Sequence, residues 1–287
     1  MMISIASGKG GTGKTTVAAN LALSIPERGV QFLDCDVEEP NASIFLKPRI
    51  EETVSVSIPV PRIDQEKCDF CGECAKICAY HALAVLPKKV LVFPHLCHGC
   101  GGCSLLCPQG AITEQDREIG RVEIGHSNGI EFIHGKLNVG EAMPTPLIRV
   151  IKEKARRRGR WTNPASVTVI DAPPGTSCSV IEAIKGSDFC ILVTEPTPFG
   201  LNDLILAVEV LKKLQVSFGV VINRSSMGDY RVDSYCQENH IPILLRIPFD
   251  REIATLYSQG IPIVQEKKEY IEDFRQMMDY IQELLPT

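Results

Sequence analysis

A hydrophobic content of 44% in 287 residues is enough to bury a full core, in one large domain or in one large and one small domain, and disorder is not expected. The net charge of −5 provides no general basic field, which argues against nucleic-acid binding and against attraction to anionic membranes. Eight of the twelve cysteines lie between Cys68 and Cys107, and the apolar run "MMISIA" is too short for a signal peptide or a membrane span. We therefore expect a cytoplasmic protein without a membrane helix, whose clustered thiolates bind metal rather than form disulfides.

The first elements are expected to be a strand, a glycine loop, a helix and a second strand. An apolar run over 2–6 precedes the glycines, a helical pattern over 14–24 ends at Pro26, and a second apolar run covers 30–35. Apolar strands alternating with helices predict an α/β fold, with a doubly wound, mostly parallel sheet covered on both faces. The later strands are expected within 166–175, 189–196, 218–224 and 243–249, and the later helices within 180–185, 202–214 and 268–285.

The segment from about 51 to 160 interrupts this alternation with cysteines, extra prolines and short alternating stretches. An insertion into a surface loop is tolerated because both of its ends emerge at the surface. We therefore predict a discontinuous main domain of residues 1–60 and 116–287 and an inserted small α+β domain of residues 61–115. Residues 116–160 show no pattern to which a function can be assigned.

The glycine loop matches G-x-x-x-x-G-K-[ST] through Gly8, Gly13, Lys14 and Thr15, directly after a strand and at the start of a helix. In that context backbone N–H groups surround the phosphates, the lysine reaches the β- and γ-phosphates, and the threonine hydroxyl binds Mg²⁺. A chance glycine turn is the alternative, which the flanking strand and helix disfavour. The residues predicted to bind ATP or ADP here are Gly8, Lys9, Gly10, Gly11, Thr12, Gly13, Lys14, Thr15 and Thr16.

A second lysine early in this loop narrows the class of protein. The stretch "GKGGTGKTT" resembles the deviant phosphate loop of the MinD/ParA superfamily of P-loop ATPases, which includes the nitrogenase iron protein and the iron-sulfur carrier ATPases. In that family the early lysine reaches the partner's nucleotide across a dimer interface. The resemblance implies that Lys9 acts in catalysis and that ATP holds two copies of the chain together as a homodimer.

Two further stretches resemble the acidic switches of this family. In "LDCDVEEPN", Asp36 matches the residue that positions the attacking water and contributes to the Mg²⁺ site; Asp34 is the alternative near magnesium, and a strand-end cap is the simpler interpretation of Asp36. In "VTVIDAPPG", Asp171 would hold a magnesium-bound water, and Gly175 would let the backbone approach the γ-phosphate. The implied catalytic residues are Lys9, Lys14, Asp36 and Asp171, with Thr15 and Asp36 at the Mg²⁺.

The adenine is expected at the ends of the last two strands. Asn223 ends "GVVIN", where the family hydrogen-bonds the base, and Pro248 in "IPFD" lies where the family closes over it. A turn-forming role is the alternative for Asn223.

The eight clustered cysteines form two runs of C-x2-C-x2-C-x3-C at a constant offset of 29 residues, which indicates an internal duplication. The runs resemble those of bacterial ferredoxins with two [4Fe-4S] clusters, in which the fourth cysteine of each run binds the other cluster. A four-thiolate zinc site is the alternative, which the three-cysteine spacing disfavours. One departure is Ala79, where the second run has Pro108. The resemblance implies one cluster on Cys68, Cys71, Cys74 and Cys107 and a second on Cys97, Cys100, Cys103 and Cys78.

Three other features have competing interpretations. Cys178, after the second switch, is either a ligand of a dimer-bridging cluster or a switch-linked thiol, and the lack of a second bridging thiolate favours the latter. The basic run 152–161 is either a DNA contact or a solvated helix C-terminus, which the preceding helical pattern favours. The helix over 268–285 is acidic on its polar face, so packing on the sheet is favoured over membrane binding. The cysteines expected to be buried as small apolar residues are Cys190 and Cys236.

Together these features predict an ATPase that also transfers electrons. ATP binding would close a dimer, hydrolysis would reopen it, and this cycle would gate electron delivery to an unknown redox or assembly partner, for example in metal-cofactor or iron-sulfur assembly. The first alternative is a MinD/ParA-like positioning or recruitment switch that uses the clusters as a redox sensor or docking module. The second is a plain electron carrier with an inert nucleotide fold, which conflicts with the intact loop and switch residues.

Overall fold

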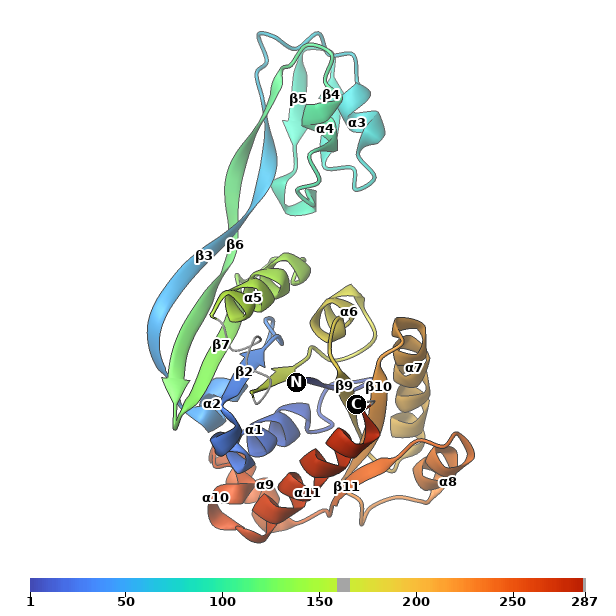
Figure 1. Cartoon of the computed structure of the whole chain (residues 1–287). Coiled ribbons are helices and arrows are strands. Elements are labelled where there is room, and N and C mark those ends of the chain that lie inside the picture. Colours follow the sequence, from blue (N-terminus) through green and yellow to red (C-terminus); the bar gives the residue numbers. More distant parts are fainter. Residues whose placement is uncertain (159–165, 286–287) are drawn as a thin grey trace.

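The computed structural model describes residues 1–158 and 166–285, and its centre is one large twisted sheet (Figure 1). Within the described residues this sheet has nine strands, in the order β11-β10-β9-β1-β8-β2-β7-β6-β3. The strands from β11 to β7 are parallel, while β6 and β3 form an antiparallel edge. The predicted α/β fold with a mostly parallel sheet is confirmed. In sheet order, the parallel strands are β11 (Ile243–Ile247), β10 (Ser217–Asn223), β9 (Phe189–Thr194), β1 (Met2–Ala6), β8 (Val167–Asp171), β2 (Val30–Asp34) and β7 (Ile130–Leu137).

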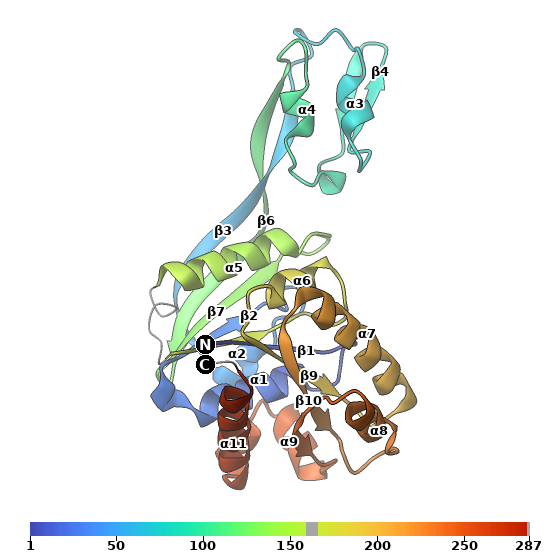
Figure 2. The same cartoon turned by 45° about the vertical axis from the view of Figure 1, so that its right-hand side comes forward.

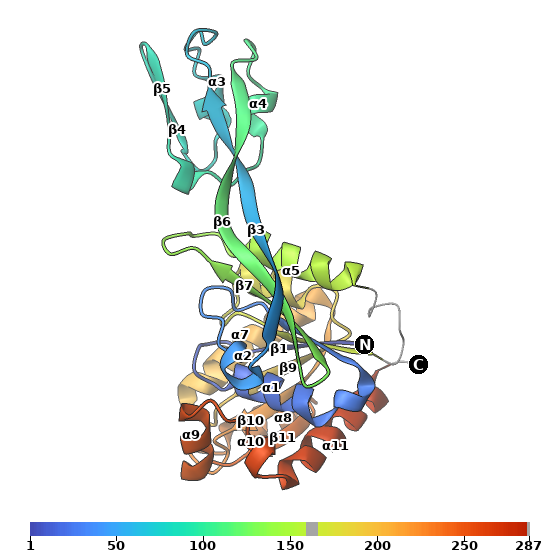
Figure 3. The ribbon, with the colours of Figure 1, turned by 90° about the vertical axis from the view of Figure 1, so that its left-hand side faces the viewer.

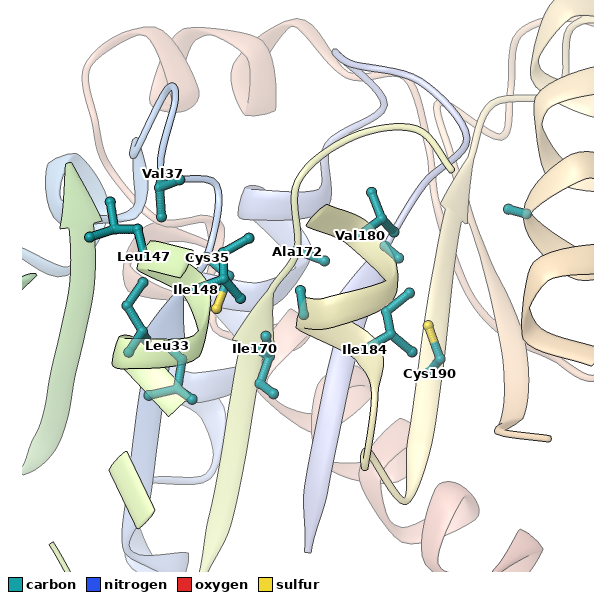
Figure 4. Close-up of a cluster of buried hydrophobic side chains, with 14 of the residues drawn as sticks. Leu33, Cys35, Val37, Leu147, Ile148, Ile170, Ala172, Val180, Ile184 and Cys190 are labelled. Carbon is teal, nitrogen blue, oxygen red and sulfur yellow. The ribbon is translucent and has the colours of Figure 1, made fainter. Parts of the chain in front are cut away.

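Helices cover both faces of the sheet, as expected for central strands that are buried on both sides (Figure 2). One apolar core lies between the sheet and one group of helices, and Figure 4 shows part of it, with Leu33, Ile148 and Ile184 among the labelled side chains. A second core lies under the helices of the opposite face. The first group is α5 (Thr145–Arg157), α6 (Cys178–Ile184), α7 (Pro198–Leu214) and α8 (Arg231–Glu238). The second group is α1 (Lys14–Ser24), α2 (Ala42–Leu46), α9 (Arg251–Ser258), α10 (Ile263–Glu266) and α11 (Glu269–Leu284), with the short turn η1 (Pro26–Arg28) after α1.

Helix α7 begins at Pro198, before the predicted start at residue 202. The Thr197 hydroxyl accepts a hydrogen bond from Gly200 N at 3.0 Å, and a proline occupies the first helical position. Both features favour a helix start at this point. The last helix, α11, follows its prediction closely, and its apolar stripe packs into the second core.

Two strands and a helix lie in residues 112–157, most of which showed no clear pattern in the sequence. Strand β7 pairs in parallel with β2, and β6 (Ile112–Ser127) joins β7 to β3 (Arg49–Ile63). The apolar pattern of β7 is broken by two buried polar residues, Glu131, which pairs with Arg158, and His134, whose Nε2 lies 2.7 Å from Glu123 Oε2. The main sheet therefore continues through a segment in which the sequence showed no regular alternation of strands and helices.

Strands β3 and β6 continue as a two-stranded ribbon beyond Gly120, where β6 last pairs with β7 (Figure 3). From there residues 57–63 of β3 extend the ribbon by about 23 Å, at about 3.3 Å per residue. Because β3 runs in the same direction as β2, the ribbon projects from the carboxyl edge of the sheet, where the glycine loop also lies.

The ribbon carries at its tip a small unit of residues 64–111, which contains all eight clustered cysteines. The predicted limits after Val60 and Gln115 lie opposite each other in the ribbon. The division of the chain into two domains stays a prediction. The elements of the tip unit are α3 (Glu73–Ile77), β4 (Leu83–Leu86), β5 (Lys89–Val92), η2 (Pro94–Leu96) and α4 (Gly102–Leu105).

Candidate nucleotide site and cysteine cavities

The glycine loop joins β1 to the N-terminus of α1. Gly11 and Gly13 adopt positive φ angles of 79° and 97°, and α1 begins at Lys14, whose side chain is buried. A Cβ atom at Gly13 would lie 2.4 Å from Asn223 Nδ2, so a larger residue does not fit this loop without displacing its neighbour. The free N–H groups of the helix N-terminus and the buried ammonium together form an anion site of the kind that binds phosphate.

Two neighbouring parallel strands end at carboxylates, because Asp34 of β2 and Asp171 of β8 are register partners. The two oxygens of Asp34 accept hydrogen bonds from Asp36 N and Ala42 N, each at 3.1 Å, so this carboxylate anchors the backbone of the first switch. Neither oxygen of Asp171 accepts a hydrogen bond of normal geometry from the described residues. Asp171 therefore has free acceptor oxygens for a bound water or cation, whereas Asp34 does not.

The electrostatics of this edge favour a divalent cation. Burial raises the pKa of Asp171 to about 7, and Asp36 adds to the shift, whereas the Thr15 hydroxyl and the Lys14 ammonium lower it. Burial likewise raises the pKa of Asp36 to about 6, and Lys14 opposes that shift. The buried carboxylate of Asp171 and the half-buried one of Asp36, beside a threonine hydroxyl, are oxygen ligands that suit a hydrated Mg²⁺. The residues present therefore fit the magnesium implied by the fold.

Asp171→Asn is expected to raise the melting temperature of the nucleotide-free protein at pH 8. The folded pKa of about 7 lies above the unfolded value of about 3.9, so the ionised carboxylate reduces stability increasingly from about pH 4 to pH 7 and by a constant amount above that. Three pKa units correspond to an upper limit of about 4 kcal/mol. The gain should shrink as the pH falls toward 4.

Thermal unfolding followed by circular dichroism without Mg²⁺ would measure this effect. Asp273→Asn, at an exposed position of α11, is the matched control and should leave the melting temperature nearly unchanged at both pH values. A lower melting temperature of Asp171→Asn at pH 8 would contradict an unbalanced buried charge at this position.

Lys9 is held at the surface by an ion pair within its own chain. Its Nζ lies 3.7 Å from Glu195 Oε2, and its side chain is 35% exposed. The same glutamate is mostly buried, and its other oxygen lies 2.7 Å from Arg224 Nη1. The sequence did not single out this glutamate or this arginine, because they lie far from the glycine loop along the chain. A role of Lys9 at a partner's nucleotide stays a prediction.

The loops after β10 and β11 lie side by side next to the glycine loop. Asn223 Nδ2 donates to Thr12 O at 2.8 Å, Ser225 N donates to Ile247 O at 2.9 Å, and Phe249 N donates to Ser226 Oγ at 3.0 Å. Asn223 therefore holds the glycine loop in this structure. Its predicted contact with adenine, and that of Pro248, stay predictions.

Two cavities in the tip unit are lined by cysteines from both runs. The first cavity extends to Ile63 and Ile112 at the tip of the ribbon, and the second borders Pro59 and Pro61 of the ribbon itself. In each cavity three cysteines come from one run and the fourth comes from the other. The cysteines are Cys68, Cys71, Cys74 and Cys107 in the first cavity and Cys78, Cys97, Cys100 and Cys103 in the second.

The 29-residue repeat is also visible in backbone conformation and hydrogen bonding. Three pairs of residues that lie one period apart have similar positive φ angles, which are 61° and 64° in the first pair, 84° and 72° in the second, and 51° and 55° in the third. Ala82 N donates to Cys78 Sγ and Ala111 N to Cys107 Sγ, each at 3.3 Å. The turn after Cys78 thus matches its repeat although Ala79 stands in place of a proline. The residue pairs with matching φ angles are Phe70 and Gly99, Gly72 and Gly101, and His81 and Gly110.

The described cysteines are not grouped around a position for a single metal ion. Among the described residues, no three His, Cys, Asp or Glu side chains surround a position for one metal ion, whereas a four-thiolate zinc site needs each sulfur about 2.3 Å from the metal. Four thiolates around each cavity are the donor set of a [4Fe-4S] cluster. Cluster binding itself stays a prediction.

The remaining predicted features lie away from both sites or next to them. Cys178 is exposed at the start of α6, just after the second switch, and Cys190 and Cys236 are buried as expected. In the described part of the basic run, Lys152 donates to three carbonyls at the end of α6, and Arg158 pairs with Glu131; residues 159–161 of this run lie outside the described residues. No helix in the described part of the chain is long and apolar enough to cross a membrane.

The sheet, the glycine loop and the acidic strand ends define a P-loop nucleotide-binding protein. The family model for the CobQ/CobB/MinD/ParA nucleotide binding domain matches residues 3–263, so the chain belongs to this family and is an ATPase of the MinD/ParA type. The superfamily predicted from the sequence is thereby confirmed.

Relatives of this chain include both uncharacterized and named proteins. MJ0579, an uncharacterized protein of Methanocaldococcus jannaschii, is 29% identical, with 95% of this chain and 96% of its own length aligned. The iron-sulfur cluster carrier protein of Pyrococcus horikoshii is 24% identical over 91% of this chain and 78% of its own. The septum site-determining protein MinD of P. horikoshii, solved with Mg-ADP, has the same fold, with a TM-score of 0.61, 22% identity and coverage of 99% of this chain and 96% of that chain.

Proposed function

We propose that this protein is an ATP-dependent homodimeric switch in which MgATP binding and hydrolysis gate electron delivery from two [4Fe-4S] clusters to a protein partner. Electron delivery of this kind would serve a redox partner or the assembly of a metal cofactor. The proposal joins a nucleotide site on the sheet edge to two cysteine cavities on a ribbon that leaves the same edge.

At the nucleotide site, the residues have separable roles. The α1 N-terminus and Lys14 would bind the phosphates, Thr15 and Asp36 would hold Mg²⁺, and the free oxygens of Asp171 would orient a water close to it. Asp36 is half-buried, and its raised pKa suits a group that positions the attacking water and receives its proton. Lys9 must leave Glu195 to reach a partner's nucleotide, so dimer closure would break an ion pair within each chain.

At the cysteine cavities, eight thiolates would hold the clusters, which supply one-electron storage when bound. Ala82 and Ala111 each direct a backbone N–H to a ligand sulfur, and such hydrogen bonds help to set the reduction potential. The protein therefore supplies the ligands, the N–H donors and the local charge.

The observation that carries the coupling is one continuous apolar core between the two sites. Val37, next to Asp36, belongs to the same core as Val56 and Ile58 of the ribbon and Cys97 of the second cavity. Val37 O also accepts a hydrogen bond from Leu137 N at 2.9 Å, where β7 ends. A close-packed core transmits displacement rather than absorbing it, so movement of the first switch would reach the ribbon.

A polar contact links the tip unit to the same region. Glu141, in the loop after β7, forms an ion pair with Arg117 of the ribbon. Arg117 Nη2 donates a hydrogen bond to Glu141 Oε2 at 3.0 Å. His95 Nδ1 of the tip unit lies 3.7 Å from Glu141 Oε1. The loop that begins beside the first switch therefore also lies close to the tip unit, two residues before the second cysteine run.

The test is anaerobic purification with iron and sulfide analysis, followed by EPR of the reduced protein with and without MgATP. We expect two clusters per chain, a MgATP-dependent dimer and a MgATP-dependent change in the EPR spectrum. In Lys9→Ala the dimer and the spectral change should be lost while iron content is kept, because this lysine is the residue proposed to reach the partner's nucleotide.

Lys213→Ala, at an exposed position of α7, is the matched control and should behave as the unmodified protein does. A zinc-only preparation would refute cluster binding. Dimer formation with an unchanged spectrum would refute gating and would favour the recruitment switch instead.

A further inference from the structure

The two cavities differ at positions that the 29-residue repeat makes equivalent. Asp69 and His98 occupy one such pair of positions, and Tyr80 and Gln109 occupy another. In the first cavity, Gln109 Nε2 donates to Asp69 Oδ2 at 3.0 Å. In the second cavity, the rings of Tyr80 and His98 are stacked, with centroids 3.4 Å apart and planes 6° from parallel. Equivalent contacts therefore place a carboxylate at one cavity and aromatic rings at the other.

The carboxylate is in direct contact with a predicted ligand residue. Asp69 Oδ1 accepts a hydrogen bond from Cys71 N at 3.2 Å, so a negative charge lies beside that thiolate and occupies its N–H group. In the second run, Gly99 N donates to Cys97 Sγ at 3.4 Å. Among the described residues, Phe70, which stands at the matching position, makes no such bond to Cys68.

The net charge around the two cysteine runs also differs, and the first run is the more negative one. Residues 64–78 contain four acidic and two basic side chains, a net charge of −2, whereas residues 93–107 contain no Asp, Glu, Lys or Arg. One carboxylate, Glu114, lines the second cavity, but it accepts from Ser104 Oγ rather than from a cysteine N–H. The acidic residues of the first run are Asp64, Glu66, Asp69 and Glu73, and the basic ones are Lys67 and Lys76.

Reduction adds an electron, so nearby negative charge opposes it, while N–H groups that donate to sulfur favour it. On this basis we propose that the two cluster sites are not equivalent. The site of Cys68, Cys71, Cys74 and Cys107 has the lower reduction potential, and an electron passes from it to the site of Cys78, Cys97, Cys100 and Cys103. One electron moves, with no bond made and no proton transferred. This inference rests on the proposed function.

The direction of transfer leads toward the nucleotide site. The first cavity lies at the far end of the ribbon, beside Ile63 and Ile112, whereas the second borders Pro59 and Pro61 and shares Cys97 with the core that reaches the first switch. An electron taken up at the tip would therefore collect at the site whose surroundings the ATP cycle can alter.

A redox titration of the full-length protein followed by EPR tests this inference. We expect two separate one-electron steps. Asp69→Asn keeps the shape of the side chain and should raise the midpoint potential of the lower step by about 59 mV, which is about a tenfold change in the equilibrium constant for one electron. The midpoint potential of the upper step should stay unchanged. Glu114→Gln should raise only the upper step.

Glu209→Gln makes the same charge change at an exposed position of α7 and should move neither step. Two clusters of equal potential, or an Asp69→Asn variant in which only the upper step moves, would overturn this inference and leave the proposed function intact. A protein without iron would overturn both.

Discussion

Lys14→Met is expected to lower the rate of MgATP hydrolysis by about 10²–10³-fold while the protein stays folded. The Lys14 side chain is 6% exposed at the first position of α1, and methionine keeps much of its volume but has no charge. Removing one positioned donor that stabilises developing charge costs about this factor in other enzymes. Phosphate release measured under saturating MgATP gives the rate, and circular dichroism checks the fold.

The matched control is Lys212→Met, at an exposed position near the end of α7, which should hydrolyse ATP at the unmodified rate. Iron content should be unchanged in both variants, because neither lysine lines a cysteine cavity. Hydrolysis by Lys14→Met within about twofold of the unmodified protein would exclude this lysine from catalysis.

The iron content of paired cysteine variants is expected to show directly that the fourth cysteine of each run binds the other cluster. Cys107→Ala should remove one cluster, or about four irons per chain. Adding Cys68→Ala should remove no further iron, because both residues line the first cavity. Combining Cys68→Ala with Cys78→Ala should remove about eight irons, because these two residues line different cavities although they belong to the same run.

Iron analysis after anaerobic purification distinguishes the two arrangements, because clusters held within single runs would reverse the results of the two double variants. Cys236→Ala, in the buried core of the main sheet, is the control and should keep all the iron. Retained ATP hydrolysis in each variant would show that the sheet is intact.

Much of the nucleotide site was predictable because its residues are close together in sequence. Gly8 to Thr16 form one loop and one helical turn, and the strand before them is apolar except for the buried Ser4. The acidic strand ends were also predictable, since Asp34 and Asp171 each follow an apolar run. The sequence did not predict which of the two carboxylates has oxygens free of hydrogen bonds. Asp34 accepts a hydrogen bond from Ala42 N, which lies eight residues away in a separate helix.

Strand β7 was missed for a physical reason. An apolar strand is recognised by its pattern, and Glu131 and His134 break the pattern of β7. Both are buried against Arg158 and Glu123, partners that only the fold brings near. The ribbon and the position of the tip unit were missed with it, since β7 joins them to the main sheet.

By itself, the sequence determined the class of fold, the phosphate loop and the duplicated cysteine runs, because each is a local pattern whose chemistry depends on neighbouring residues. The roles of the two switch aspartates stay predictions. The tertiary structure alone decided that Lys9 pairs with Glu195 and that the cysteine cavities stand on a ribbon joined to the first switch by one core. These are contacts between residues far apart along the chain, and their energies depend on packing and burial that no local pattern specifies.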